Sequence, residues 1–190
     1  MIGIPLGLLY ANAGEWLIHK YVLHGVGRDR SSFWSFHFHE HHRAVRAEDG
    51  FDPDYERSVV GWHAQGKEAL GLAAAAVAHL PLLPIAPMFT GAVLYSIGRY
   101  YVVHKKSHLD PEWAREHVPW HYDHHMGPNP HCNWGVTWPW FDHVMGTREY
   151  YVGTEREKRD RARKAEFLAR RAQANAQTSP NAPEPSATTA

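Results

Sequence analysis

The chain has 190 residues, a length typical of one domain, and 44% of them are hydrophobic. Lysine plus arginine and aspartate plus glutamate each number 20, so the formal net charge is zero at pH 7 and no nucleic acid partner is expected. The single cysteine, Cys132, excludes an intramolecular disulfide and a cysteine-pair zinc site, which fits a reducing, cytosol-facing setting. Histidine is in excess: the chain has 16, and most of them stand in tight groups.

The first predicted element covers residues 1–23, which are mostly apolar. Asn12, Glu15 and His19 interrupt the apolar run near its end. The pattern therefore predicts a helix that enters a membrane or a core and ends in polar residues. The first histidines of the chain lie at that polar end.

The stretch 69–103 has one charged residue, Arg99, and its middle contains three prolines. Because proline interrupts helices, the pattern predicts a helical hairpin with arms at 69–80 and 88–103. Each arm is shorter than the roughly 20 apolar residues that a perpendicular span needs, so a re-entrant hairpin competes with full crossing. The negative mean hydropathy of the chain leaves a soluble helical bundle as the alternative.

The end of the chain differs in composition from the rest. Residues 154–174 are highly charged, with basic residues in excess, and predict a helix, whereas residues 175–190 are rich in Ala, Gln, Thr, Ser and Pro and predict a disordered tail. The main domain is therefore expected at 1–153. The basic helix is expected to present a solvated face, and contact with anionic lipid is the alternative.

Ten histidines fall into four clusters along the chain. They are His19 and His24; His37, His41 and His42; His104 and His108; and His121, His124 and His125. Positions three or four apart share a face of an α-helix, so histidines at such spacing can converge on a metal. His19 and His24 are five apart, about 140° on a straight helix, so one of them is expected past a helix end or on a different metal.

The number of clustered imidazoles indicates more than one metal ion. Imidazole suits zinc, copper, iron and nickel, and a structural zinc ion needs only about four ligands. Two metals with histidine-rich shells account for the ten residues. Iron is favoured because a redox metal with open positions can activate oxygen beside an apolar substrate. Zinc is the alternative in the protein as purified.

Several polar residues near the clusters can support the ligands. Glu15, one turn before His19, and Asp123, inside the last cluster, can each accept the second imidazole N–H, although capping or exposed carboxylates are the alternative. His131 and His143 are further candidates for this supporting role. The remaining histidines, His39, His63, His79 and His117, are not expected to be ligands.

The clusters, read as H-x4-H at His19, H-x3-HH at His37, H-x3-H at His104 and H-x2-HH at His121, resemble the histidine boxes of the fatty acid hydroxylase and sterol desaturase superfamily in spacing and order. The segment WHYDHHMGPNPHCNWGVTWPWFDHVMGT also resembles that family's last box, with an asparagine and glycine-valine-threonine segment and a closing aspartate-to-glycine-threonine turn. The resemblance covers roughly residues 14–147.

This resemblance implies an all-α protein: a membrane-associated helical bundle with a hydrophobic hairpin and a cytosolic, histidine-rich cap that holds two irons. It implies that the ten clustered histidines are the iron ligands, and Asn133 matches the asparagine that follows the last box. The protein would be integral or re-entrant in the membrane, with its active site and C-terminal tail facing the cytoplasm.

The expected function is that of a di-iron lipid hydroxylase that uses O2 as co-substrate. No electron-transfer domain is attached, so a separate donor is expected, such as ferredoxin or cytochrome b5 with its reductase. A lipid desaturase or a carotenoid ring hydroxylase, which the segment HKYVLHG resembles, is an alternative with the same chemistry. The further alternatives are a zinc-dependent hydrolase, with Glu40 or Asp123 as base, and a non-enzymatic metal-binding membrane protein.

Overall fold

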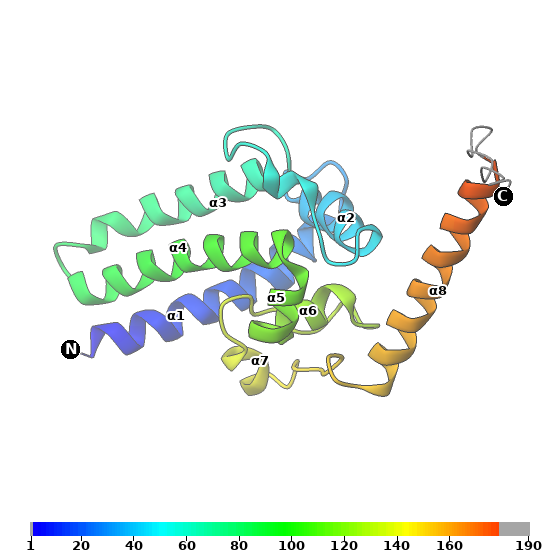
Figure 1. Ribbon diagram of the computed structural model, residues 1–190. Helices are drawn as coiled ribbons and strands as arrows, with labels where there is room; N and C mark the ends of the chain where they lie inside the picture. The colour runs from blue at the N-terminus through cyan, green and yellow to red at the C-terminus, as the bar shows by residue number, and fades with distance from the viewer. Residues whose placement is uncertain (1, 179–190) are drawn as a thin grey trace, which may run out of the picture. The chain divides into compact units, whose positions relative to one another are not determined.

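The structure is a computed structural model that describes residues 2–178, and every regular element in that range is helical (Figure 1). The predicted all-α fold is therefore confirmed. The chain divides into two compact units, Met1–Val152 and Gly153–Ala190. The first unit contains all the clustered histidines.

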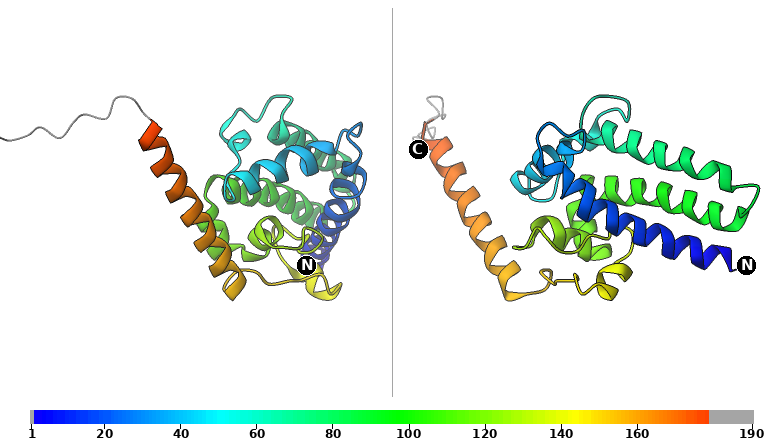
Figure 2. Two further views of the ribbon diagram at one scale, coloured as in Figure 1. Left: turned by 90° about the vertical axis from the view of Figure 1, so that its right-hand side faces the viewer. Right: turned by 180° about the vertical axis from the view of Figure 1, so that it is seen from behind.

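Three long helices form the frame of the first unit. They are α1 (Gly3–Leu17), α3 (Ala64–His79) and α4 (Pro87–Leu109). Helices α1 and α3 both pack against α4, as the views in Figures 1 and 2 show. The start of α1 and the connection between α3 and α4 lie at the same end of this frame.

Shorter helices follow the long ones and carry the remaining histidines. Two π-helices carry histidines: η1 (Ile18–Leu23) continues directly from α1, and η3 (His37–His41) leads directly into α2. The α-helices are α2 (His42–Ala47), α5 (Pro111–His117), α6 (Pro119–Met126) and α7 (Trp140–Val144), and the 3-10 helices are η2 (Val26–Arg28), η4 (Pro53–Glu56) and η5 (Leu80–Leu82).

The prolines of the sequence act where their missing N–H costs least. The predicted hairpin corresponds to α3 and α4 joined by η5, and Pro87 occupies the first position of α4. Pro111 and Pro119 likewise begin α5 and α6, where a fixed φ and an absent N–H are both tolerated. The resulting short helices turn the chain back beside α4, so the last histidine cluster faces the one on α4.

No helix among residues 2–178 combines the length and the apolarity that a membrane crossing requires. The expectation of a transmembrane helix is therefore not met in this part of the chain. Helices α1 and α3 have 15 and 16 residues, below the roughly 20 that a span needs. Helix α4 has 23 residues, but Arg99, Lys105 and Lys106 place charges along it.

The second unit contains α8 (Glu155–Thr178). Ion pairs between residues three or four apart lie along it, including Lys158 with Glu155 and Arg170 with Glu166. The helix extends past the boundary predicted at residue 174 because Ala and Gln in that segment are good helix formers. The rest of the predicted tail, residues 179–190, lies outside the described residues.

A loop between α6 and α7 is fixed by one buried carboxylate. Asp142, 0% exposed, accepts hydrogen bonds from the backbone N–H groups of Trp134 (2.9 Å) and Gly135 (2.8 Å) and from the hydroxyl of Thr147 (2.7 Å). The turn after α7, which leads to Thr147, uses Gly146 at φ +65°, a conformation that favours glycine. Asp142 therefore positions the backbone of residues 134–135 against α1.

We expect Asp142→Ala to lower the free energy of unfolding by about 2–5 kcal/mol, because two buried N–H groups lose their acceptor. Asp110→Ala is the matched control: its carboxylate accepts from one N–H, that of Trp113, at an exposed helix start, and its loss should cost about 1 kcal/mol. Chemical denaturation of both variants measures the difference. Equal losses would show that Asp142 is no more than a local cap.

Candidate metal centre

The structure brings the ten predicted histidines together in the interior, where none is more than 6% exposed. Nine of them form two groups in which the ligand nitrogens lie within 4.8 Å of one another. The first group contains His19, His24, His37, His42 and His124, and the second contains His41, His104, His108 and His125. Each group is therefore able to bind a metal ion.

The two π-helices explain how the first group forms. The backbone N–H of His24, at the end of η1, bonds to the carbonyl oxygen of His19 at 2.9 Å. In the same way, the backbone N–H of His42, at the end of η3, bonds to the carbonyl oxygen of His37. An i→i+5 pattern places residues five apart on one face, which a straight α-helix does not do. His24 does lie just past the end of η1, as expected, yet it joins the same group as His19.

Neighbours in the sequence also divide between the two groups, because successive residues of a helix point about 100° apart. His41 and His42 are adjacent, but His41 joins the second group and His42 the first. His124 and His125 on α6 divide in the same way. His121 lies beside the second group, with its Nε2 atom 3.1 Å from that of His108. The four sequence clusters therefore do not correspond to individual metal sites.

Distances within the first group indicate whether its members can share a metal ion. The Nε2 atoms of His24, His42 and His124 form a triangle with sides of 2.9, 3.1 and 3.2 Å. With a metal–nitrogen distance near 2.1 Å, ligands at right angles are about 3.0 Å apart, whereas tetrahedral ligands are about 3.4 Å apart. The His19–His37 distance of 3.0 Å fits the same pattern. These distances are therefore short enough for several of the imidazoles to share one metal ion.

Backbone carbonyls hold the outer nitrogens of the first group. The Nδ1 atom of His19 lies 2.6 Å from the carbonyl oxygen of Trp134. The Nδ1 atom of His124 lies 2.7 Å from the carbonyl oxygen of Cys132. A carbonyl oxygen only accepts, so each Nδ1 donates and the neutral ring directs its Nε2 lone pair inward. This is the tautomer that a metal ligand requires.

Carboxylates hold the second group in the same way. His41 Nδ1 donates to Asp52 at 2.7 Å, His104 Nδ1 donates to Glu68 at 2.7 Å, and Tyr55 also bonds to Glu68. The Nε2 atoms of His41 and His104, and both ring nitrogens of His125, are buried without a hydrogen-bond partner. Buried ring nitrogens without partners are costly, and a bound cation would satisfy the nitrogen of each neutral ring that carries a lone pair. The residues present therefore fit metal ions.

Burial sets the charge state of these imidazoles. It lowers the pKa of His19 to about 3, and it lowers the pKa of the other shifted members well below the usual range, with neighbouring imidazoles adding to the effect. These members are His24, His37, His41, His42, His108, His121, His124 and His125. The rings are therefore neutral at pH 7 and keep lone pairs for a metal.

The two carboxylates predicted to orient ligands lie elsewhere. Glu15 accepts hydrogen bonds from the backbone N–H groups of Val136 and Thr137, and burial raises its pKa to about 7 despite these bonds. Asp123 accepts from the backbone of residues 151–152 and pairs with Arg148 at 2.7 Å. Both support loops, and the orienting role that was predicted for them falls to Asp52 and Glu68.

The other predicted supporting residues also have no contact with a clustered imidazole. Asn133, at φ +56°, donates to the carbonyl of Glu149 at 2.9 Å and organises the loop after α6. His131 is exposed and contacts Arg28, 3.1 Å away. His143 is exposed on α7. Asp52, Tyr55 and Glu68 were missed because no spacing in the sequence links them to the histidines.

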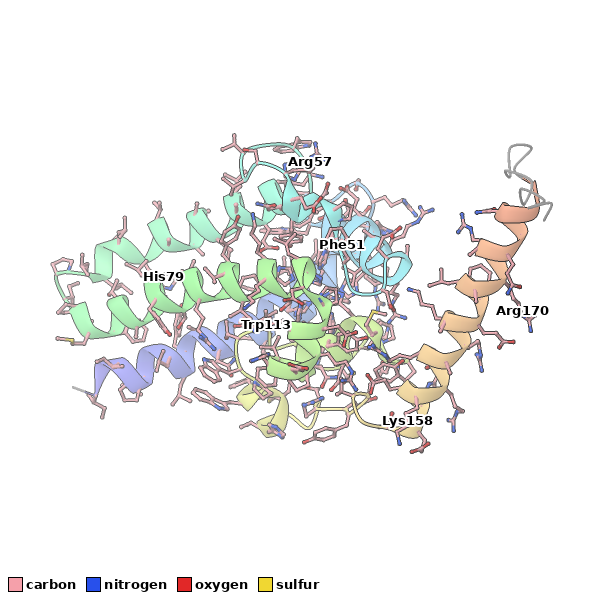
Figure 3. All side chains as sticks on the ribbon, viewed as in Figure 1. Phe51, Arg57, His79, Trp113, Lys158 and Arg170 are labelled. Atoms are coloured by element: carbon pink, nitrogen blue, oxygen red, sulfur yellow. The ribbon has the colours of Figure 1, made fainter. Side chains whose placement is uncertain are left out.

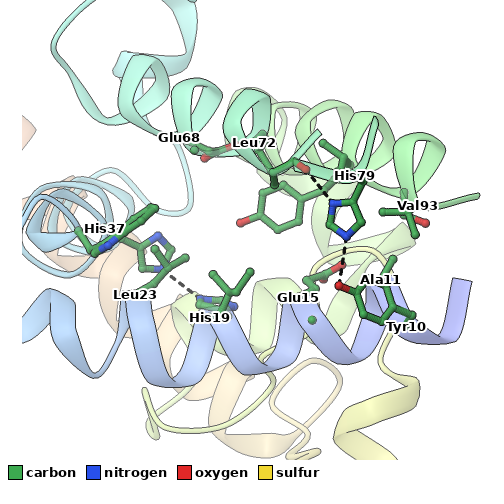
Figure 4. Close-up of a pocket in the computed structure, with 18 of the residues that line it drawn as sticks. Tyr10, Ala11, Glu15, His19, Leu23, His37, Glu68, Leu72, His79 and Val93 are labelled. Carbon is green, nitrogen blue, oxygen red and sulfur yellow. Dashed lines mark hydrogen bonds between the residues drawn. The ribbon is translucent and has the colours of Figure 1, made fainter. Parts of the chain in front are cut away.

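An apolar cavity of about 210 Å³ ends at the first group (Figure 4). It lies between α1, α3 and α4, and both His19 and His37 line it. The walls are mainly small or aliphatic residues, including Ala11, Leu72 and Val93. A cavity of roughly 150 Å³ lined in this way is known to bind benzene, so this one has room for an apolar ligand.

Comparisons of the chain with models of protein families, with curated proteins and with solved structures give no match. The assignment of a function therefore depends on the residues and their geometry.

We expect Asp52→Asn to weaken metal binding by the second group roughly tenfold, because an orienting carboxylate typically contributes a factor of that size. Asp54→Asn is the matched control, since Asp54 bonds to Arg57 and to the N–H of Ala64 and touches no clustered histidine. Competition with a chelator, followed by elemental analysis, measures the affinity. Equal affinities in the two variants would contradict the orienting role of Asp52.

We also expect the metal-free protein to lose stability steeply as the pH falls below 6.5. A histidine whose folded pKa is depressed binds its proton only in the unfolded state, so stability is full above 6.5 and falls below it. Nine of the clustered histidines have depressed pKa values, so their losses act in the same direction over the same pH range and the fall in stability is expected to be steep.

Circular dichroism during acid titration measures this transition. Metal-loaded protein should unfold at a lower pH, because metal binds only the folded form. A metal-free protein that keeps its full stability at pH 4.5 would show that the imidazoles are not held neutral by burial.

Proposed function

We propose that this protein is a di-iron, O2-dependent lipid hydroxylase of the fatty acid hydroxylase and sterol desaturase type, which receives electrons from a separate donor. One observation carries the proposal: His19 and His37 belong both to a buried imidazole group and to the wall of an apolar cavity. A metal held there would face the interior of a pocket suited to hydrocarbon. The histidine spacing of the sequence supports the same family.

The ten clustered histidines would hold the two irons, with His121 as the tenth ligand beside the second group. When bound, the irons would supply the redox chemistry by which O2, two external electrons and two protons convert a C–H bond into C–OH and release the second oxygen atom as water. Imidazole suits iron, and sites with open positions are typical of non-haem iron oxygenases.

The protein's own residues bind, orient and shield. The neutral imidazoles give lone pairs without titrating near pH 7, and Asp52 and Glu68 fix the rings of His41 and His104. The apolar cavity walls exclude water from the region beside His19 and align an alkyl chain with it. A lipid desaturase or a carotenoid ring hydroxylase would use the same arrangement.

We propose further that the protein associates with a membrane through the end of the frame that lies away from the metal groups. Ile2, Leu6, Leu83, Ile85 and Met88 are exposed there, on the start of α1 and around the α3–α4 connection. Exposed apolar side chains concentrated at one end favour re-entrant insertion. The metal groups would then face the cytoplasm, within reach of a ferredoxin or of cytochrome b5 with its reductase.

The zinc hydrolase alternative lacks support from the structure, because neither carboxylate considered as its base is placed for that role. Glu40 is exposed and pairs with Lys67 at 3.3 Å, and Asp123 is engaged by Arg148 and the backbone of residues 151–152. A general base must reach the water that it activates.

We expect elemental analysis of protein expressed with ample iron to give about two irons per chain, and His124→Ala and His41→Ala each to reduce this to about one, since they belong to different groups. His117→Ala should retain both, because His117 is exposed and bonds only to Trp113 on its own helix. One zinc per chain, or equal metal loss in all three variants, would overturn the proposed function.

A further inference from the structure

The outer end of the apolar cavity is formed by a polar pair. Tyr10 on α1 and His79 on α3 are joined by a hydrogen bond of 3.1 Å between the tyrosine oxygen and Nε2 (Figure 4). Figure 3 shows His79 on the side of α3 that faces the other long helices. Ala11, Ala75 and Val93 also line the cavity, whose other polar side chains are those of Glu15, Glu68, Ser96, Tyr100 and the metal-facing histidines.

The direction of the hydrogen bond follows from the other nitrogen of His79. Nδ1 lies 2.7 Å from the carbonyl oxygen of Ala75, which only accepts, so Nδ1 carries the proton. In the neutral ring Nε2 is then an acceptor, and the hydroxyl of Tyr10 donates to it. The Tyr10 oxygen keeps lone pairs that are free to accept a hydrogen bond from a ligand.

This arrangement selects between kinds of ligand end group. A hydroxyl group can donate to the Tyr10 oxygen without disturbing the pair. A carboxylate has no proton to donate, and no lysine or arginine among the described residues lines the cavity to hold its charge. An unsubstituted hydrocarbon would make no hydrogen bond at all. The pair is therefore suited to an alcohol.

The polar pair and the metal groups lie at opposite ends of the cavity. Tyr10 precedes His19 by nine residues on one helix, which corresponds to about 13 Å. His79 follows Glu68, also a cavity residue, by eleven residues on α3, or about 16 Å. Both helices thus give a similar distance between the hydroxyl position and the carbon that would face the metals.

We propose that the Tyr10–His79 pair binds the hydroxyl group of the substrate, which makes the substrate class an apolar lipid alcohol oxidised about 13–16 Å from that hydroxyl. The identification of this ligand as the substrate rests on the proposed function. Gly14 lines the cavity between its two ends, and a Cβ there would meet nothing within 4 Å. The absence of a side chain at this position therefore leaves space for a ligand. A Cβ at this position would begin to fill the ligand's place without striking the protein.

The test is equilibrium binding of tritiated decanol to metal-loaded, unreduced protein in lipid nanodiscs, with empty nanodiscs as background and with decanoic acid and decane as competitors. We expect decanol to bind at least fivefold more tightly than either competitor. Tyr10→Phe keeps the ring but removes the acceptor, so it should weaken decanol binding roughly fivefold and abolish its advantage over decane. Its iron content should match that of the unchanged protein.

Gly14→Leu should abolish binding of all three compounds. The matched control is Gly98→Leu on α4, which is exposed and also meets nothing within 4 Å, and which should bind decanol normally. Both changes favour the helix, so loss of folding is not expected from either. Normal binding by Gly14→Leu would show that the cavity is not the binding site.

Equal affinity for decanoic acid and decanol, or an equal effect of Tyr10→Phe on every compound, would overturn hydroxyl recognition. These outcomes are independent of the metal. Decanol selectivity in a protein without two irons would preserve the binding site and overturn the oxygenase, whereas two irons without selectivity would do the reverse.

Discussion

Burial of many imidazoles around two small volumes is the constraint on which the rest of this structure depends. A buried ring must be neutral, and each of its nitrogens must find a partner. At His19, His41, His104, His108 and His124 the outer nitrogen donates to a carbonyl or carboxylate oxygen. The inner nitrogens then have lone pairs that only a cation, or a limited number of shared protons, can satisfy. The surrounding loops are built to supply the outer acceptors at the right places.

The helices could not meet this requirement with regular geometry alone. In an α-helix residue 41 would lie near residue 37, whereas residue 42 would lie about 140° from residue 37, just as residue 24 would from residue 19. The two π-helices change both relations, so His37 and His42 converge while His41 turns to the neighbouring group. A π-turn is less favourable than an α-turn, and its presence at functional sites in other proteins agrees with its use here.

The sequence predicted the ten histidines correctly as residues that come together, because helical spacing is a local property and the clusters are dense. It could not predict how they divide into two groups, since that depends on where the π-turns fall and on how the helices pack against one another. Asp52 and Glu68 could not be found either: Glu68 meets His104 across 36 positions, and nothing in the local pattern of α3 marks it. Glu15 and Asp123 are close to histidines in sequence, but their side chains leave the helices toward loops.

Helix α1 connects these features because its successive turns have different partners. Ala11, Gly14 and Ile18 line the cavity, whereas Asn12 and Glu15 hold the loop of residues 136–141 through hydrogen bonds. That loop follows directly on Trp134, whose carbonyl fixes the ring of His19 on η1, the π-helix that continues α1. The helix thus sets the cavity wall, the position of the loop and the orientation of a metal-facing imidazole together. A shift of α1 along its axis would move all three, which explains why its polar residues are tied to the loop rather than left in solvent.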